Sequence, residues 1–271
     1  SVLYPLLAYE HDVTVFDLHP PHSAMRFIPG DVRYQIPPMK EMDAVIYLAG
    51  ITNNDDCEAD KKKHHEVNEL AFYPIITSAF NSGVKRFIYA SSVAAYGTSD
   101  DLLDESQELR PTTLYGQAKA LCDRLTRSQG GIVVRSASVC GPSPRMANHL
   151  TVNRMVHDGL NKGVVTINGG GQTRCHIHIR DLCEFYRLLL RVRVNRIAGQ
   201  AFNVVYKNQS VIDTGRMVST VLRCKLEVKS ATDDRSYKVS GDKAREELGF
   251  WPQWTILNAV EEMHENAVVV G

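Results

Sequence analysis

Short apolar runs alternate with longer amphipathic segments through the first half of the chain. A short apolar run between polar residues indicates a buried strand, and apolar positions that recur every three or four residues indicate a helix. The runs predict strands at residues 11–17, around Phe27, and at 45–50, 86–90 and 132–136, with helices at residues 1–10, at 60–82 and around Tyr115. Because strands and helices alternate, the pattern predicts an α/β fold with a doubly wound parallel sheet.

The second half of the chain is patterned less regularly. It predicts helices at residues 152–160, 181–192 and 244–248, and strands at 164–167 and 201–205. We therefore expect a first domain over residues 1–142 and a smaller C-terminal lobe over residues 143–271, interleaved with the sheet.

Composition narrows the class of protein. The chain has 271 residues, 44% of them hydrophobic, and its 31 basic and 31 acidic residues give zero formal net charge. A large core is therefore possible, and no general attraction to nucleic acid is expected. The six cysteines show no C-x-x-C spacing, and no apolar run approaches the ~20 residues of a membrane helix, so we expect a cytoplasmic protein with reduced cysteines and no membrane attachment.

Candidate chemistry lies around a tyrosine and a lysine at helical spacing. Tyr115 and Lys119 are four residues apart and share one face of the predicted helix. A free phenol has a pKa of about 10, and a neighbouring ammonium group favours its ionised form, so the pair suits a tyrosine base. Upstream, Ser91 and Ser92 follow the strand at 86–90, and ligands of such sheets bind at the carboxyl ends of strands.

These motifs together resemble the extended short-chain dehydrogenase/reductases, the branch of nucleotide-sugar epimerases, dehydratases and reductases. The resemblance rests on the serine-rich run at 91–97, the Y-x-x-x-K pair and the Gly-Pro at 141–142, and it covers the chain from its first residue to about Glu262. It implies NAD as cofactor, a Rossmann-type NAD-binding domain at 1–142 and a mainly substrate-binding lobe at 143–271. It also implies the catalytic residues Ser92, Tyr115 and Lys119. In these roles Tyr115 removes a hydroxyl proton as hydride leaves for nicotinamide, Ser92 stabilises the oxyanion and Lys119 holds the ribose.

The resemblance also implies residues for the cofactor. An acid at the end of a strand accepts hydrogen bonds from the adenosine ribose and favours NAD over NADP. The cofactor-binding residues implied in this way are Asp17, Asp31, Val32, Leu48, Ala49, Gly50, Ser91, Tyr115 and Lys119.

One family element is absent from the sequence. The glycine-rich turn, whose backbone N–H groups hold the pyrophosphate, and the strand before it do not appear. The chain opens at Ser1-Val-Leu, where family members follow directly on the last glycine of the turn. We expect the intact protein to carry both elements before Ser1; the alternative is a fragment that cannot bind NAD tightly.

For the substrate, the resemblance implies a nucleotide-diphosphate sugar. Guanidinium groups match phosphate oxygens bidentately, so the arginines are the candidates for holding the diphosphate. The implied substrate-binding residues are Ser92, Ser138, Arg145, Arg174 and Arg235. His176 and His178 alternate along an extended segment, but no third ligand is near in sequence and we expect no metal.

Departures from the family pattern narrow the reaction. Sugar 4,6-dehydratases carry an Asp-Glu pair directly after the strand-end hydroxyl, where this chain has Val93 and Ala94. The leading interpretation is NAD-dependent epimerisation at C4 through a transient 4-keto sugar. A 4-ketosugar reductase or sugar dehydrogenase is the alternative, and a non-catalytic sensor or scaffold that keeps the fold is a further one. We also expect a homodimer, paired through the helices around Ala71 and Leu121, as is common in this family.

Overall fold

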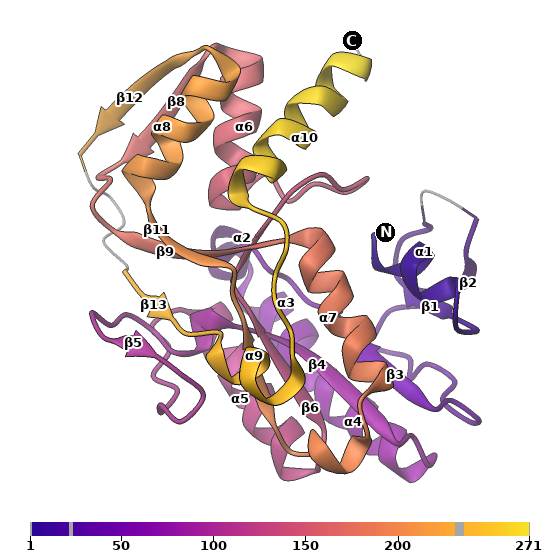
Figure 1. The fold of residues 1–271 in the computed structure, drawn as a ribbon. Helices are drawn as coiled ribbons and strands as arrows, with labels where there is room; N and C mark the ends of the chain where they lie inside the picture. Colours follow the sequence, from indigo (N-terminus) through magenta and orange to yellow (C-terminus); the bar gives the residue numbers. More distant parts are fainter. Residues whose placement is uncertain (1, 22–23, 231–235, 271) are drawn as a thin grey trace.

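A four-stranded parallel sheet forms the centre of the first domain. The computed structural model describes residues 2–21, 24–230 and 236–270 and has the α/β architecture predicted from the sequence (Figure 1). The strands are hydrogen-bonded in the order β10-β6-β4-β3. Their bounds are Ala44–Tyr47 for β3, Arg86–Ser92 for β4, Ile132–Ser136 for β6 and Ala201–Val204 for β10. Since β10 comes from the second half of the chain, the two halves are interleaved.

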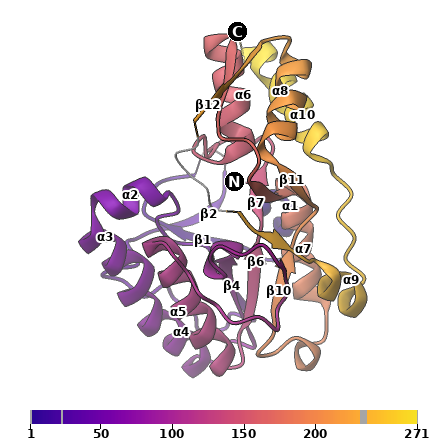
Figure 2. The ribbon, with the colours of Figure 1, turned by 90° about the vertical axis from the view of Figure 1, so that its left-hand side faces the viewer.

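Helices cover both faces of this sheet. Alternate side chains of β4 point to opposite faces, as in any strand. Phe87 and Tyr89 join a buried cluster with α4 (Phe72–Asn81), and α5 (Leu114–Ser128) packs on β4 as well. Ile88 lies in a separate cluster with α7 (Ile179–Arg191). Figure 2 shows α4 and α5 side by side.

The N-terminal elements form a small unit beside the sheet. Helix α1 (Leu3–Ala8) packs on α7, and β1 (Thr14–Asp17) pairs in parallel with β2 (Arg26–Pro29). Within the described residues this pair has no ladder to β3. The helix and both strands agree with the sequence pattern, although α1 and β1 are shorter than the predicted ranges 1–10 and 11–17.

The predicted helix at residues 60–82 is present from Lys61 to Asn81, but a π-helical turn interrupts its regular α-helical bonding. The structure divides the region into α2 (Asn54–Ala59), α3 (Lys61–His65), a π-helical turn (Glu66–Leu70) and α4. The carboxylate of Asp60 accepts a hydrogen bond from the Lys63 N–H and so begins α3. Pro74, in the first turn of α4, has no N–H to donate to the Leu70 carbonyl, so regular α-helical bonding is interrupted there.

The C-terminal lobe has its own core. A three-stranded sheet has the order β11-β9-β7, and β12 pairs with β8. Helices α6, α8 and α10 contribute Val156, Val218 and Val260 to one buried cluster. The bounds are β7 Ser138–Cys140, α6 Thr151–Lys162, β8 Val164–Asn168, β9 Thr173–His178, β11 Lys207–Ser210, α8 Val211–Leu222, β12 Lys225–Lys229 and α10 Ile256–Val270.

Short elements connect the lobe to the sheet. Strand β13 (Lys238–Val239) pairs with β5 (Leu102–Leu103) from the loop between β4 and α5. Helix α9 (Asp242–Leu248) packs on β10, and 3₁₀ turns lie at Val93–Ala95 and Val194–Arg196. No helix in the described ranges is long and apolar enough to cross a bilayer.

Candidate active site

The end of β4 and the start of α5 meet at the carboxyl edge of the sheet. Ser92 ends β4, and its Oγ accepts the Ala94 N–H at 3.2 Å, which starts the turn Val93–Ala95. Thr113 caps α5 by accepting the Gly116 N–H at 3.1 Å. A Cβ on Gly116 would lie 2.6 Å from the Ala94 carbonyl oxygen, so only glycine lets the first turn of α5 approach so closely. This approach brings Tyr115 to Ser92.

Lys119 is buried beneath Tyr115. Its side chain is only 5% exposed, and its Nζ donates to the carbonyl oxygen of Ala90 at 2.5 Å. The ammonium group also lies 4.8 Å from the ring centre of Tyr89 and 5.6 Å from that of Tyr115. Burial lowers the pKa of Lys119 to about 8, because the charged form loses its hydration. The lysine therefore remains mostly charged at neutral pH, and burial of this charge lowers the stability of the folded protein.

Tyr115 is protonated at neutral pH in this structure. Burial raises its pKa to about 12, and a hydrogen bond with Ser92 acts in the opposite direction. From the spacing of the two residues alone, Lys119 is predicted to lower the pKa of Tyr115. Here the ammonium group is directed at the Ala90 carbonyl, and desolvation of the phenol outweighs the hydrogen bond from Ser92. Further positive charge in the site would favour the phenolate.

Asn68 is a residue that the sequence analysis missed. It lies in the π-helical turn, and its amide brackets the backbone of Ile51: Oδ1 accepts the Ile51 N–H at 2.7 Å and Nδ2 donates to the Ile51 carbonyl at 2.8 Å. This clamp fixes the loop that leaves β3 directly after Gly50. A single asparagine in an amphipathic segment gives no signal in the sequence, although π-helical turns often accompany functional sites.

The cofactor candidates lie where parallel strands end. Asp17 ends β1 with an exposed carboxylate, which accepts the backbone N–H of His19 at 2.9 Å. The Gly30 N–H donates to the Asp17 carbonyl at 3.0 Å, which brings the segment after β2 beside it. There, the guanidinium group and the backbone N–H of Arg33 both donate to the carboxylate of Asp31, and these hydrogen bonds lower its pKa.

The remaining cofactor candidates differ in exposure. Val32 packs against the cluster of α4, whereas Leu48, just after β3, is 50% exposed. Ala49 is half-buried and Gly50 is exposed. Ser91 is buried, and its hydroxyl donates to Asp123 at 3.2 Å, so only its backbone is available to a cofactor.

These residues fit a dinucleotide. Lys119 makes a single hydrogen bond among the described residues, to the Ala90 carbonyl, so further donor hydrogens of its ammonium group remain for ribose hydroxyls. Asp17 offers exposed acceptor oxygens, and the exposed backbone at Leu48 and Gly50 leaves room for a flat ligand. Asp17, Leu48 and Gly50 would hold the adenosine and pyrophosphate side, and Lys119 the nicotinamide ribose.

The substrate candidates lie on the sheet of the C-terminal lobe. Ser138, on β7, is in register with His176 on β9. Arg174 is 8% exposed, and its guanidinium carbon lies 5.3 Å from the ring centre of Tyr237. Arg235 is outside the described residues. The chain that follows it runs beside β9, because the Thr173 N–H donates to the Ser236 hydroxyl at 3.1 Å and the Thr173 carbonyl accepts the Tyr237 N–H at 3.3 Å.

Arg145 and the two histidines stand apart from this group. Arg145 is exposed in a turn, where its backbone N–H donates to the Ser143 hydroxyl at 3.3 Å. His178 stacks on Trp254, and its Nδ1 accepts the Arg180 N–H at 3.1 Å. His176 is fully buried, and neither ring nitrogen has a hydrogen-bond partner among the residues that the structure describes. Burial lowers the pKa of both histidines to about 4, so both are neutral.

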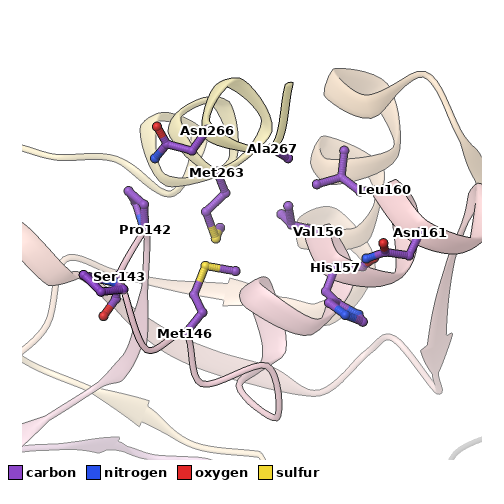
Figure 3. A pocket seen from close by; sticks show the side chains of 11 residues that line it. Pro142, Ser143, Met146, Val156, His157, Leu160, Asn161, Met263, Asn266 and Ala267 are labelled. Carbon is purple, nitrogen blue, oxygen red and sulfur yellow. The ribbon is translucent and has the colours of Figure 1, made fainter. Parts of the chain in front are cut away.

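A cavity of about 520 Å³ lies in the lobe, between α6, α10 and the loop that follows β7. Figure 3 shows Met146 of the loop and Met263 of α10 pointing toward each other across it. Its walls are mostly apolar, and none of the sequence-predicted site residues lines it. The candidate active site is therefore defined by the convergence of Ser92, Tyr115 and Lys119 at the edge of the sheet.

Comparisons with known proteins identify the family of the chain. The UDP-glucose 4-epimerase of Lacticaseibacillus casei is 22% identical over 303 residues, which cover 96% of this chain and 92% of that enzyme. The dTDP-D-glucose 4,6-dehydratase of Dictyostelium discoideum is 27% identical, but over only 56% of this chain and 39% of that protein. The solved structure of MoeE5 in complex with UDP-glucose and NAD superposes with a TM-score of 0.86 at 23% identity, covering 97% of this chain and 94% of the other. The family model for the NAD dependent epimerase/dehydratase family matches residues 6–204, and the chain therefore belongs to that family of enzymes.

Proposed function

We propose that this enzyme inverts C4 of a nucleotide-diphosphate sugar by way of a transient 4-keto intermediate. The observation that carries the proposal is the grouping of Ser92 and Tyr115 over the buried ammonium of Lys119. A hydroxyl, a phenol and a fixed cation at one point are what reversible proton transfer from a sugar hydroxyl needs. The full-length similarity to a 4-epimerase supports this reaction.

Tyr115 and Ser92 have different roles in the proton transfer. Tyr115 takes the proton of the C4 hydroxyl and later returns it to the C4 oxygen, when hydride is delivered to the opposite face of the 4-keto sugar. Ser92, already hydrogen-bonded to Tyr115, stabilises the oxygen while charge develops on it. NAD, when bound, would supply the acceptor for the C4 hydride and then return it, and its oxidised ring would add positive charge to the site.

The turn after β4 argues against water loss as the reaction. Val93 is 2% exposed and Ala95 is fully buried, so this turn faces the core with apolar side chains. A dehydratase needs an acid and a base beside the sugar to remove water from neighbouring carbons. Val93 and Ala94 offer neither, which supports simple oxidation and reduction at C4.

Recognition of the diphosphate is proposed for arginines of the lobe. Arg174 lies at the start of β9, and the chain just beyond Arg235 runs beside it. Two guanidinium groups at this place would neutralise a diphosphate, with Ser138 facing the sugar from β7 and Arg145 reaching in from its exposed turn. The cytoplasm is the expected compartment, since nucleotide sugars are made there.

Tyr115→Phe tests the proposal. The protein is incubated with NAD and a panel of nucleotide sugars, and the products are examined by NMR while NADH absorbance is followed. We expect the native protein to invert C4 without net NADH, and we expect the rate of inversion to fall by about 10²- to 10⁴-fold in the variant. Tyr9→Phe, at a tyrosine that is 90% exposed and follows α1, is the control.

Each other outcome has a defined meaning. Net formation or consumption of NADH would identify a reductase or dehydrogenase instead. Full activity of Tyr115→Phe would refute the assigned base, and silence of the native enzyme across the panel with NAD bound would refute the substrate class.

A further inference from the structure

A buried carboxylate continues the line of catalytic residues along α5. Tyr115, Lys119 and Asp123 are spaced by four residues and lie on one helix face. Asp123 has no exposed surface, and it forms a two-point ion pair with Arg135 of β6, itself 1% exposed. The Arg135 Nε lies 2.8 Å from Oδ2, and Nη2 lies 3.0 Å from Oδ1.

This pair holds groups from three neighbouring strands. Ser91 of β4, Arg135 of β6 and Asn203 of β10 are in register, so their side chains leave the same face of the sheet. The Ser91 hydroxyl donates to Asp123 at 3.2 Å, and Arg135 Nη1 donates to the hydroxyl of Tyr96 at 2.8 Å. That hydroxyl in turn donates to Asn203 Oδ1 at 2.9 Å.

The network encloses the end of β4 from both sides. Ser91 stands between Ala90, whose carbonyl holds Lys119, and Ser92, which meets Tyr115. Tyr96 closes the turn that Ser92 begins, since its backbone N–H donates to the Val93 carbonyl. Asp123 therefore contacts Ser91, just before Ser92, and Arg135 contacts Tyr96, in the turn after it. None of the hydrogen bonds described for the pair involves the phenol of Tyr115.

Stability alone does not account for such a pair. Desolvation of two charges is costly, and well-packed apolar side chains of similar size are often equally stable in their place. The contacts of the pair are with the strand and turn that carry Ser92 and with the helix that carries Tyr115. A displacement of about 1 Å between reacting groups can cost about a hundredfold in rate.

We propose that Asp123 and Arg135 are positioning residues that fix α5 against β4, and that Tyr96 extends this lock to the turn after Ser92. The inference rests on the proposed function, because it concerns the geometry of the same proton transfer. The lock sets the distance from Tyr115 to Ser92 and from Lys119 to the Ala90 carbonyl.

The double variant Asp123→Leu/Arg135→Met tests this role. It removes both charges together and so leaves no unpaired ion in the core. We expect a folded protein with a melting temperature close to native and a KM within a few-fold of native. We expect kcat to fall by about a hundredfold. Thr126→Val is the matched control, since Thr126 is buried on the same helix and its hydroxyl donates to the Cys122 carbonyl within that helix.

Two further measurements keep the test decisive. Tyr96→Phe leaves the core charges paired and removes only the hydroxyl link, so it serves if the double variant does not fold; we expect kcat to fall about tenfold because the turn after Ser92 loses its anchor. NMR of protein labelled with ¹³Cζ-tyrosine reports the Tyr115–Ser92 hydrogen bond without any substrate, with the Tyr115 signal assigned from Tyr115→Phe. We expect that signal to move in the double variant and to stay in place in Thr126→Val.

The outcomes separate the two proposals. If the native protein epimerises no nucleotide sugar, the proposed function fails, while the tyrosine signal still decides whether the lock positions Tyr115. Native kcat and an unmoved Tyr115 signal in the folded double variant would overturn the positioning role. Native kcat in Tyr96→Phe would overturn its extension to the turn.

Discussion

Replacing Lys119 by methionine separates the cost of the buried ammonium group from its use in catalysis. Methionine fills a similar volume without charge. In the native protein Lys119 is 5% exposed, and burial lowers its pKa from the ordinary 10.5 to about 8. That difference corresponds to about 3 kcal/mol, at about 1.4 kcal/mol for each factor of ten in the dissociation constant.

The sign of the pH dependence follows from the lowered pKa. Below pH 8 the lysine is charged in both the folded and the unfolded state, so the native protein bears the whole desolvation cost. Between pH 8 and pH 10.5 the folded lysine has lost its proton while the unfolded one keeps it, so the native protein gains stability as the pH rises. Relative to Lys119→Met, its free energy of unfolding should therefore increase by about 3 kcal/mol from pH 7 to pH 10.5.

The assay is urea unfolding without NAD, followed by circular dichroism at several pH values for native protein and variant. Other titrating groups are common to both proteins, so the difference between the two unfolding free energies isolates Lys119. Lys85→Met, which removes an exposed lysine just before β4, should give a flat difference over the same range. A flat difference for Lys119→Met as well would refute the argument that this ammonium group is desolvated in the folded protein.

Two more changes test the surroundings of the site. Leu121 on α5 is 47% exposed, and Leu70 and Tyr73 on the adjoining elements are each 58% exposed. We expect these side chains to pair across a homodimer, so that Leu121→Arg gives monomers in light scattering. The control, Leu257→Arg on α10, should leave the dimer intact. A native protein that is monomeric at all concentrations would contradict the dimer. Asn68→Ala removes both amide hydrogen bonds to the Ile51 backbone, so it should lower the free energy of unfolding by about 1–3 kcal/mol and weaken NAD binding in calorimetry. The control is Asn161→Ala, whose amide donates to the His157 carbonyl within α6, and it should change the free energy of unfolding by less than about 0.5 kcal/mol. Native NAD affinity in Asn68→Ala would show that the clamp does not shape the cofactor site.

The sequence by itself determined the local elements that carry the chemistry. The apolar runs predicted the strands of the central sheet, and the Y-x-x-x-K spacing placed Tyr115 and Lys119 on one helix face. These predictions succeed because strand alternation and helical periodicity are properties of a few neighbouring residues. The serines after the strand at 86–90 were predicted at its carboxyl end for the same reason.

Contacts between distant segments were decided only by the tertiary structure. Asn68 meets Ile51 from 17 residues away, and Tyr96 meets Asn203 from 107 residues away, so no local pattern signals either bond. The π-helical turn within residues 60–82 was not predicted either, because the spacing of apolar residues does not reveal it. Register between strands determines which side chains share a face, and it depends on the whole sheet.

The protonation states of Tyr115 and Lys119 also depend on the tertiary structure. The spacing of Tyr115 and Lys119 suggested a phenol with a lowered pKa, but the structure buries both groups and directs the ammonium at the Ala90 carbonyl. The sequence determines which ionisable groups are neighbours on a helix. How much water they keep depends on what packs over them, and hydration determines the direction in which each pKa moves.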